Sequence, residues 1–312
     1  MWETRQSVGS HTKFRSGEGG GDAVARQTGG MTVTYAWTVR DVVEVAGPDA
    51  AAYLQGQLSQ DVLGLSVGES APTFVLAPQG KVDGWGRVHR TGEDAFAIDV
   101  DAGAGSRWQT RLSRFLLRTK AEIAVRQDVP TLVVRGATVE GGLPATGLGL
   151  TGSDLIGVDG PDLPPTVPAD AVEVSADELE VQRISAGVPV WGSELDDDTI
   201  PATVGQWVID ASVSFTKGCY TGQELVARID SRGGNVPRHL VGVVVDGPPP
   251  EAGTVITVEG AAAGDVTSSA IDRARGASVA LAFVPRSIEV AADGTKAEVA
   301  GVPATLIPLP IP

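Results

Sequence analysis

The chain has 312 residues, of which 42% are hydrophobic and 20% charged, and its formal net charge is -15. This length is sufficient for roughly two domains with a substantial core. The acidic balance argues against a face that contacts nucleic-acid phosphates or an anionic membrane, and no apolar run approaches the ~20 residues that span a bilayer. A single cysteine excludes an internal disulfide and a self-sufficient iron–sulfur site. We therefore expect a cytoplasmic protein.

Residues 1–30 differ in composition from the rest of the chain. They are rich in Gly, Ser, Arg and Thr, show no apolar periodicity and lack the hydrophobic stretch of a signal peptide, so they predict a disordered tail. Met1 and Met31 are the only two methionines. Because Met31 directly precedes the first strand-like run, the choice between Met1 and Met31 as the true start stays open.

Strand and helix signals alternate through the first half of the chain. Alternating or β-branched runs predict strands, and apolar residues at helical spacing predict helices. We expect strands at 33–39, 41–46 and 131–135, a helix with Ala51, Leu54 and Leu58 on one face, a β-hairpin over 74–88, and a core-facing helix at 107–118 with Trp108, Leu112, Phe115 and Leu116 on one face. The Gly- and Pro-rich residues 141–170 predict a loop region.

A helix-start signal and an acidic cluster follow. Ser175 and Glu178 form a capping-box pattern for a helix that runs to 184, and Gly187 is placed to end it. Several acids come next in the sequence, namely Glu194, Asp196, Asp197 and Asp198. Clustered acids without interleaved ligands favour a solvated loop over a metal site, so we expect no metal here.

The last quarter of the chain alternates short apolar runs with Gly and Pro turns. The runs at 240–245, 254–258, 278–284 and 297–302 predict strands. Short strands at such regular spacing are typical of a small β-barrel or sandwich.

The only cysteine, Cys219, lies in the stretch K-G-C-Y-T-G-Q-E. Gly218 and Gly222 permit tight turns around it, and helical spacing resumes after Gly222, so we expect Cys219 just before a helix N-terminus. The helix dipole and the nearby cation of Lys217 would favour the thiolate, which is the nucleophilic and metal-binding form. The alternative is a buried structural cysteine, because free cysteines are often buried.

This stretch, followed by Arg228, resembles the signature of the YgfZ family, folate-binding proteins involved in iron–sulfur cluster assembly or repair. Further stretches resemble this family and the related T-protein, the aminomethyltransferase of glycine cleavage. They are the segment 47–58, the R-I-x-x-G-x-P element at 183–189 and the G-x-V-T-S turn at 264–269.

The resemblance implies an α+β, T-protein-like multi-subdomain folate-binding fold with a small C-terminal β-barrel domain. We expect a folate-binding region of two interleaved subdomains at 31–236 and the barrel at 237–312. The implied cofactor is tetrahydrofolate or a one-carbon derivative. The implied partners are folate and iron–sulfur client or assembly proteins, with neither nucleic acid nor membrane.

The signature, together with the charge of the folate that the resemblance implies, suggests the site residues. Cys219 is the expected reactive residue, and the expected folate-binding residues are Lys217, Tyr220, Gln223, Glu224, Arg228 and Arg118. A flat heterocycle with an anionic tail requires an apolar or aromatic slot together with cations, for which Lys120, Arg232 and Arg238 are further candidates. Each residue also has an alternative role. A lone arginine often forms only a surface ion pair. Tyr220 is equally suited to packing, and Glu224 is equally suited to a contact with the helix dipole.

Two departures from the T-protein argue against aminomethyl transfer. The T-protein has a G-G-x-x-D-D element, and in this chain Gly84 and Trp85 occupy the positions of its two aspartates. Asp83 is offset from them by one residue, and such an offset turns a strand side chain to the other face unless a bulge intervenes. Ser185 occupies the position of the pterin-binding glutamate. We therefore favour a folate-binding accessory factor that is not a turnover enzyme. A folate-dependent one-carbon transferase or demethylase, and a folate-binding scaffold with an inert cysteine, remain alternatives.

Overall fold

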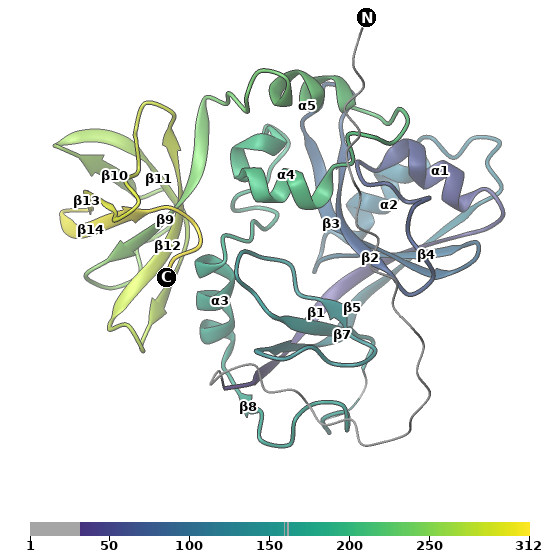
Figure 1. Cartoon of the computed structure of the whole chain (residues 1–312), viewed down its shortest axis with the longest axis horizontal. Coiled ribbons are helices and arrows are strands. Elements are labelled where there is room, and N and C mark those ends of the chain that lie inside the picture. Colours follow the sequence, from purple (N-terminus) through teal and green to yellow (C-terminus); the bar gives the residue numbers. More distant parts are fainter. Residues whose placement is uncertain (1–31, 159, 161) are drawn as a thin grey trace, which may run out of the picture. The chain divides into compact units, whose positions relative to one another are not determined.

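The computed structural model describes residues 32–158, 160 and 162–312. The predicted disordered tail at 1–30 lies outside these residues. Within them, no helix combines the length and apolar character needed to cross a membrane. The described chain contains an eight-stranded sheet with helices and, after it in sequence, a closed β-barrel (Figure 1).

The large sheet is built around its first strand, β1 (Thr34–Ala46), which pairs with β4, β5 and β8. The strand order is β2 (Ser70–Leu76), β3 (Val82–Gly92), β4 (Ala95–Asp101), β1, β5 (Glu122–Arg135), β7 (Gly152–Ile156) and β6 (Leu143–Pro144), with β8 (Val172–Glu173) added parallel to β1. The two strands expected at 33–39 and 41–46 are one strand with a bulge between Arg40 and Val42. The hairpin expected at 74–88 is confirmed as β2 and β3.

The bulge in β1 is stabilised by a buried carboxylate. Asp41 is fully buried, and its Oδ2 accepts the backbone N–H groups of Gly103 at 3.0 Å and Gly105 at 2.9 Å. Its Oδ1 accepts the N–H of Asp128 at 3.1 Å. A buried charge with three backbone donors is well compensated, so Asp41 ties β1 to the start of α2.

Two helices, α1 (Ala50–Gln57) and α2 (Gly105–Ser113), cover one core of the sheet. Leu54, Trp108 and Leu112 are at most 1% exposed and belong to this core. The expectation for 107–118 is wrong beyond Ser113, because the helix ends there and Phe115 is 45% exposed.

The region expected as a loop at 141–170 contains two short strands, β6 and β7, which extend the sheet beyond β5. The helix α3 (Ala176–Ser185) follows, with the predicted capping box between Ser175 and Glu178, and Gly187 has φ of 65° just after it. Three short helices come next in sequence: η1 (Pro201–Val204), α4 (Gln206–Ser212) and α5 (Gln223–Asp230).

The predicted small C-terminal β-barrel is confirmed (Figure 1). Around the barrel the strands are β10 (Val255–Val258), β11 (Ala261–Asp272), β12 (Ala277–Pro285), β9 (Arg238–Val245), β14 (Val302–Ile307) and β13 (Thr295–Val299). Two sequence interpretations are wrong in detail. Residues 264–269 lie within β11 rather than in a turn, and 297–302 spans the turn between β13 and β14.

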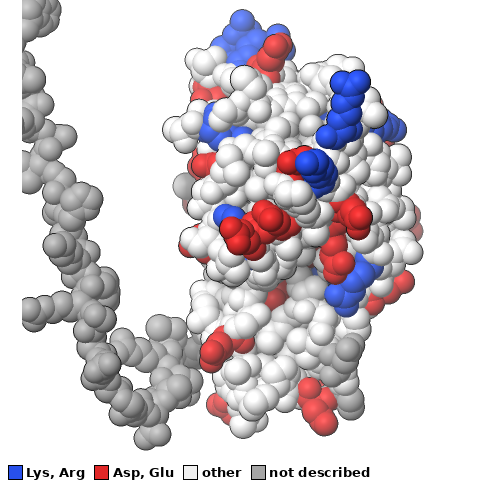
Figure 2. All heavy atoms as spheres, turned by 90° about the vertical axis from the view of Figure 1, so that its right-hand side faces the viewer, with Lys and Arg blue, Asp and Glu red and all other residues white. Residues whose placement is uncertain are grey.

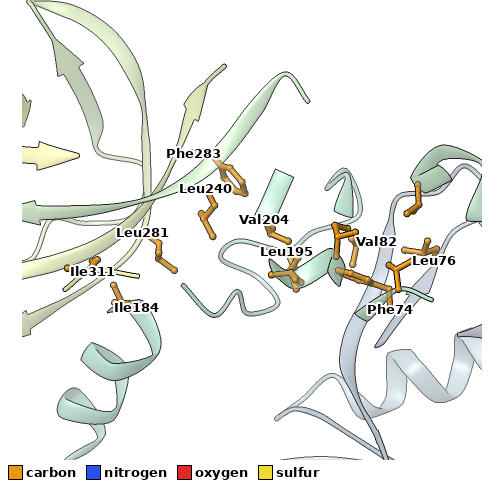
Figure 3. Packing of buried hydrophobic residues seen from close by; sticks show 14 of the residues in the cluster. Phe74, Leu76, Val82, Ile184, Leu195, Val204, Leu240, Leu281, Phe283 and Ile311 are labelled. Carbon is orange, nitrogen blue, oxygen red and sulfur yellow. The ribbon is translucent and has the colours of Figure 1, made fainter. Parts of the chain in front are cut away.

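One hydrophobic core joins the barrel to the sheet and the intervening helices (Figure 3). Leu240, Leu281 and Phe283 reach it from the barrel, and Ile184 from α3. On the other side it includes Phe74 from β2. Because this core is continuous, side chains of α3 are fixed against both β11 and the sheet.

Candidate functional site

A cavity of about 400 Å³ lies between the large sheet and α3, and is lined by residues of β1, β3 and β5 on the sheet side. Its apolar lining comes from Val39, Pro72, Trp85, Val133, Leu150, Leu179, Val188, Pro189 and Val190. Its charged lining comes from Arg40, Arg87, Arg135, Arg183, Asp99, Asp101, Asp154 and Glu180. A cavity of this size that combines apolar side chains with fixed polar groups is typical of a small-molecule site.

The sheet side of this central cavity is an arginine–aspartate network. Arg87 binds Asp99 through two contacts at 2.9 and 3.2 Å and Asp154 at 3.1 Å. Arg40 binds Asp99 at 3.2 Å and Asp101 at 2.8 Å, and Asp154 also accepts from Arg135 at 2.8 Å. Side-chain exposure is only 4% for Asp99 and 7% for Arg87.

Charge pairing controls the ionisation of this network. Burial alone would raise the pKa of Asp99, but Arg87 and Arg40 outweigh it and hold that pKa below its usual range. Burial likewise opposes the charge of Arg40, yet Asp101 and Asp99 raise its pKa above the ordinary value. These groups therefore stay charged at neutral pH.

The helix side of the cavity belongs to a second network, centred on Glu194. Glu194 is 1% exposed, so the expectation of a solvated acidic loop is wrong for this residue. Its carboxylate accepts hydrogen bonds of 2.6 Å from Thr267 and from Ser268 in β11, and lies 3.3 Å from Arg183 of α3. Arg183 also donates to Glu180. The R-I-x-x-G-x-P and G-x-V-T-S stretches thus meet at one buried acid.

Two side chains of the cavity wall are suited to a flat, polar ligand. Trp85 presents an indole whose N–H is already bound to Ser212 at 2.9 Å, so its ring stays in place for stacking. Gln182 has a buried Oε1 with no hydrogen-bond partner in the described ranges, while its amide nitrogen lies 3.4 Å from Thr34 Oγ1. A buried acceptor without a donor costs free energy, which a ligand N–H would recover.

The signature stretch forms a separate feature, the loop 214–222 ahead of α5. Cys219 is exposed, so the alternative of a buried structural cysteine is wrong. The helix begins at Gln223 with Gly222 as its N-cap, as expected for a thiol just before a helix. Gly222 has φ of 82°, and a Cβ there would lie 2.5 Å from the Ala77 carbonyl oxygen. Glycine is therefore required for this close approach.

Lys217 holds this loop against the end of α1. Its ammonium donates to the carbonyl oxygens of Leu58 and Gln60, both at 2.7 Å, and lies 5.1 Å from the ring centre of Tyr220. Burial lowers the pKa of Lys217 to about 8, and burial raises the pKa of Tyr220 to about 12. The contacts of Lys217 are those of a loop anchor.

The low pKa of Lys217 predicts a pH-dependent stability. Between about pH 8 and pH 10.5 the unfolded chain still binds this proton and the folded chain has released it, so unfolding free energy rises with pH in this window. Relative to Lys217→Met, we expect the wild type to gain about 1–2 kcal/mol there, after allowance for partial exposure. Urea unfolding of both proteins at pH 7.5 and 10.5 measures this gain. Lys296→Met, at an exposed barrel lysine, should show the same rise in stability with pH as the wild type. If Lys296→Met lost this rise as Lys217→Met does, Lys217 would not be its source.

None of the seven site residues predicted from the sequence lines the central cavity. Tyr220 is buried, and Gln223 accepts its backbone N–H at 3.1 Å. Glu224, Arg228 and Arg118 are exposed. The structure therefore gathers six of them around the signature loop and α5, and places Arg118 in the turn after α2. Of the further candidates, Arg238 stacks on Phe283 at 4.0 Å, and Lys120 and Arg232 are exposed.

The bulge considered for Asp83 is present, but it does not bring the acid into the cavity. Gly84 pairs with Val75 while Val82 pairs with Leu76, which leaves Asp83 as the extra residue. Its carboxylate binds Arg111 at 2.9 Å and Arg107 at 3.3 Å, both on α2. Neither Asp83 nor Ser185 is part of the cavity lining.

The charged residues that do line the cavity were not predicted from the sequence. One signal was available for two of them: in β4, Phe96, Ile98 and Val100 alternate with Asp99 and Asp101. Alternation assigns the acids to the face opposite the core. Arg40, which pairs with both acids, lies 59 and 61 residues away, and Arg87, the other partner of Asp99, lies 12 residues away on the neighbouring strand β3, so the pairing follows from sheet register rather than from a sequence motif.

Comparisons with known proteins agree with this architecture. The family model described as the glycine cleavage T-protein C-terminal barrel domain matches residues 238–311. The crystal structure of the glycine cleavage system aminomethyltransferase T from Bartonella henselae has a TM-score of 0.70 at 18% identity, covering 90% of this chain and 86% of that one. The chain therefore has a T-protein-like fold, which confirms the expected fold class.

Sequence relatives narrow the assignment. An uncharacterized protein of Haemophilus influenzae is 30% identical over 207 residues, which are 66% of this chain and 71% of that protein. The tRNA-modifying protein YgfZ of Edwardsiella ictaluri is 28% identical over 62% of this chain and 65% of its own length. A mitochondrial iron-sulfur cluster assembly factor IBA57 homolog of Pyricularia oryzae is 28% identical over 62% of this chain and 53% of its length. The chain belongs to the YgfZ family, which is related to the T-protein.

Proposed function

We propose that this chain is a tetrahydrofolate-binding accessory protein that supports the assembly or repair of iron–sulfur cluster proteins, with Cys219 as its reactive residue. The main observation in support of folate binding is the central cavity, which is surrounded by an indole, apolar side chains and arginines. The name of one relative, an iron-sulfur cluster assembly factor, supports the proposed role with iron–sulfur proteins.

The residues of the cavity suit the proposed cofactor. The pterin of a reduced folate carries N–H donors along one edge, which the unpartnered Oε1 of Gln182 would accept. Trp85 would stack on the ring. The exposed part of Arg40 would attract the carboxylates of the glutamate tail, since its guanidinium uses only two of its five N–H donors, on Asp101 and Asp99. When bound, the folate would supply a carrier for a one-carbon unit.

The site offers little support for aminomethyl transfer. Proton transfer at a folate nitrogen needs a positioned acid or base, which typically contributes about 10²–10⁴-fold. The acids of the cavity are bound to arginines, and Asp83 is bound to Arg107 and Arg111 away from it. The exposed thiol of Cys219 lies outside the cavity lining, where a partner protein or a cluster would reach it.

A titration with tetrahydrofolate tests the proposed folate binding. We expect quenching of tryptophan fluorescence on binding, because Trp85 lines the cavity. Gln182→Met should bind about 5–20-fold more weakly, equivalent to the loss of one buried hydrogen bond of about 1–2 kcal/mol.

The matched control is Gln206→Met, since Gln206 is an exposed glutamine of α4 outside the central cavity. If the wild-type protein does not bind tetrahydrofolate, the proposed folate binding is wrong. Rapid transfer of an aminomethyl carbon to the folate by the purified chain would instead identify it as a transferase.

A further inference from the structure

The turn that follows α2 presents two large apolar side chains to solvent. Leu117 is 86% exposed and Phe115 is 45% exposed. The backbone around them is nevertheless ordered, because Phe115 N–H donates to the Leu112 carbonyl at 3.1 Å and Thr119 N–H to the Leu116 carbonyl at 3.0 Å. Ordered backbone that holds apolar groups in water is typical of a recognition surface.

The conformation of this turn is also costly for the chain. Arg118 adopts φ of 64°, a left-handed backbone that residues with a Cβ disfavour. The turn is fixed on its far side, where Lys120 N–H donates to Asp49 Oδ2 at 2.8 Å and Asp49 N–H to the Lys120 carbonyl at 3.2 Å. The strained residue is therefore held in place, and its neighbour Leu117 is held outward.

Positive charge surrounds these apolar groups. Residues 107–120 contain five basic residues and no acidic one, in a chain whose net charge is -15. Arg107 and Arg111 are bound to Asp83. The other three, Arg114, Arg118 and Lys120, are exposed and form no ion pair within the part of the chain that the structure describes.

We propose that this basic–apolar turn, residues 114–120, docks an acidic protein segment in which carboxylates flank an apolar side chain. Exposed arginine beside an aromatic or aliphatic anchor is the composition of an interface hot spot. Leu117 and Phe115 need a dry apolar contact, which another polypeptide supplies. A nucleic acid or an anionic membrane supplies phosphates instead, and its extended charge would face the net charge of -15 over much of the surface, whereas a short acidic segment would face only the local cations.

Charge is not segregated on the side of the molecule that carries α1 and α2 (Figure 2). Figure 2 shows the side of the molecule with α1, α2 and β4, where basic and acidic side chains are interspersed with uncharged surface. A local cluster of unpaired cations on such a surface selects a partner segment rather than a broad polyanion.

Arg111, which packs against Phe115 of the basic–apolar turn, and the Cys219 loop contact the same end of α1. Arg111, whose guanidinium lies 4.7 Å from the ring centre of Phe115, donates to Gln57 at 3.1 Å. Thr221 N–H donates to the Gly56 carbonyl at 3.1 Å. A partner docked on the turn would therefore lie beside the loop that carries the thiol. The inference stands independently of folate binding and of the role proposed for Cys219.

A selection of random peptides displayed on phage, with the full chain as bait, tests this inference. We expect enriched peptides to carry several Asp or Glu residues around a Leu, Phe or Trp. Leu117→Asp, and separately Arg114→Glu combined with Arg118→Glu, should weaken binding of the best peptide at least about tenfold. Higher salt should weaken its binding to the wild type.

The matched controls lie on the barrel, where Ile271→Asp and Lys296→Glu alter an exposed apolar and an exposed basic residue. Both should bind the peptide as the wild type does, and melting curves establish that every variant is folded. No enrichment, enrichment of peptides without acids, or equal binding by Leu117→Asp would overturn the proposal. Binding of total tRNA or of phosphatidylglycerol vesicles through the same residues, with no acidic peptide selected, would also overturn it.

Discussion

Asp99→Asn should destabilise the folded chain by about 3–5 kcal/mol at pH 7, the usual cost of removing one partner from a buried ion pair. Asparagine keeps the volume of the side chain but removes the charge that compensates both Arg87 and Arg40. Asp99 is fixed by these partners at 2.9 and 3.2 Å in a setting where its side chain is only 4% exposed. Urea unfolding measures the loss.

The effect of this substitution should depend on pH in a defined direction. The folded pKa of Asp99 lies below its ordinary value. The stabilisation is therefore complete above the unfolded pKa of about 4 and is lost as the pH falls through the folded pKa. The stability difference between wild type and Asp99→Asn should consequently shrink only below about pH 4.

Asp198→Asn is the matched control, because its carboxylate pairs with Lys81 while 85% exposed. We expect a change below about 1 kcal/mol for this surface pair. Equal losses for the two substitutions would contradict the claim that burial makes the Asp99 network costly to break.

Local sequence signals located most elements but not where they end. In α2 the apolar spacing continues to Leu116, yet the helix stops at Ser113. The turn that follows is anchored by the Lys120 N–H, which binds Asp49, a residue 71 positions earlier. A contact between residues so far apart leaves no mark in the local periodicity, so the exposed turn at Phe115 could not be predicted from the sequence.

The C-terminal barrel shows the same limit. Small polar residues and Gly264 suggested a turn at 264–269, but these residues pair with β12 across a bulge. The φ of Gly264 is 133°, and a Cβ there would lie 2.0 Å from the carbonyl oxygen of Phe283. Glycine therefore marks a close approach between strands here, which sequence alone does not distinguish from a turn.

The two candidate sites differ in the same way, in whether local sequence reveals them. The Cys219 loop was found because its chemistry is contiguous in sequence. The central cavity was missed because Arg40, Arg87 and Asp99 come from separate strands and meet only through sheet register. Strand alternation gives the face of each side chain but not its cross-strand partner.

Cys219→Ser should abolish the proposed cellular function and leave folding intact. The thiol is exposed, so its replacement by a hydroxyl should change the melting temperature by less than about 1 °C. A hydroxyl is a far poorer nucleophile and metal ligand than a thiolate. In a strain that lacks the chain, enzymes that contain iron–sulfur clusters should stay at the deletion level when Cys219→Ser is supplied, and recover with the wild type.

Thr216→Ala is the matched control in the same loop, since Thr216 is also exposed and lies 3.4 Å from the Ser214 hydroxyl. It should restore cluster enzymes as fully as the wild type. Full rescue by Cys219→Ser would show that the thiol is inert and that the chain acts as a scaffold. A drop in melting temperature of more than about 4 °C, which corresponds to over 1 kcal/mol for a chain of this size, would instead assign Cys219 a role in folding, because loss of the fold would then explain the loss of function.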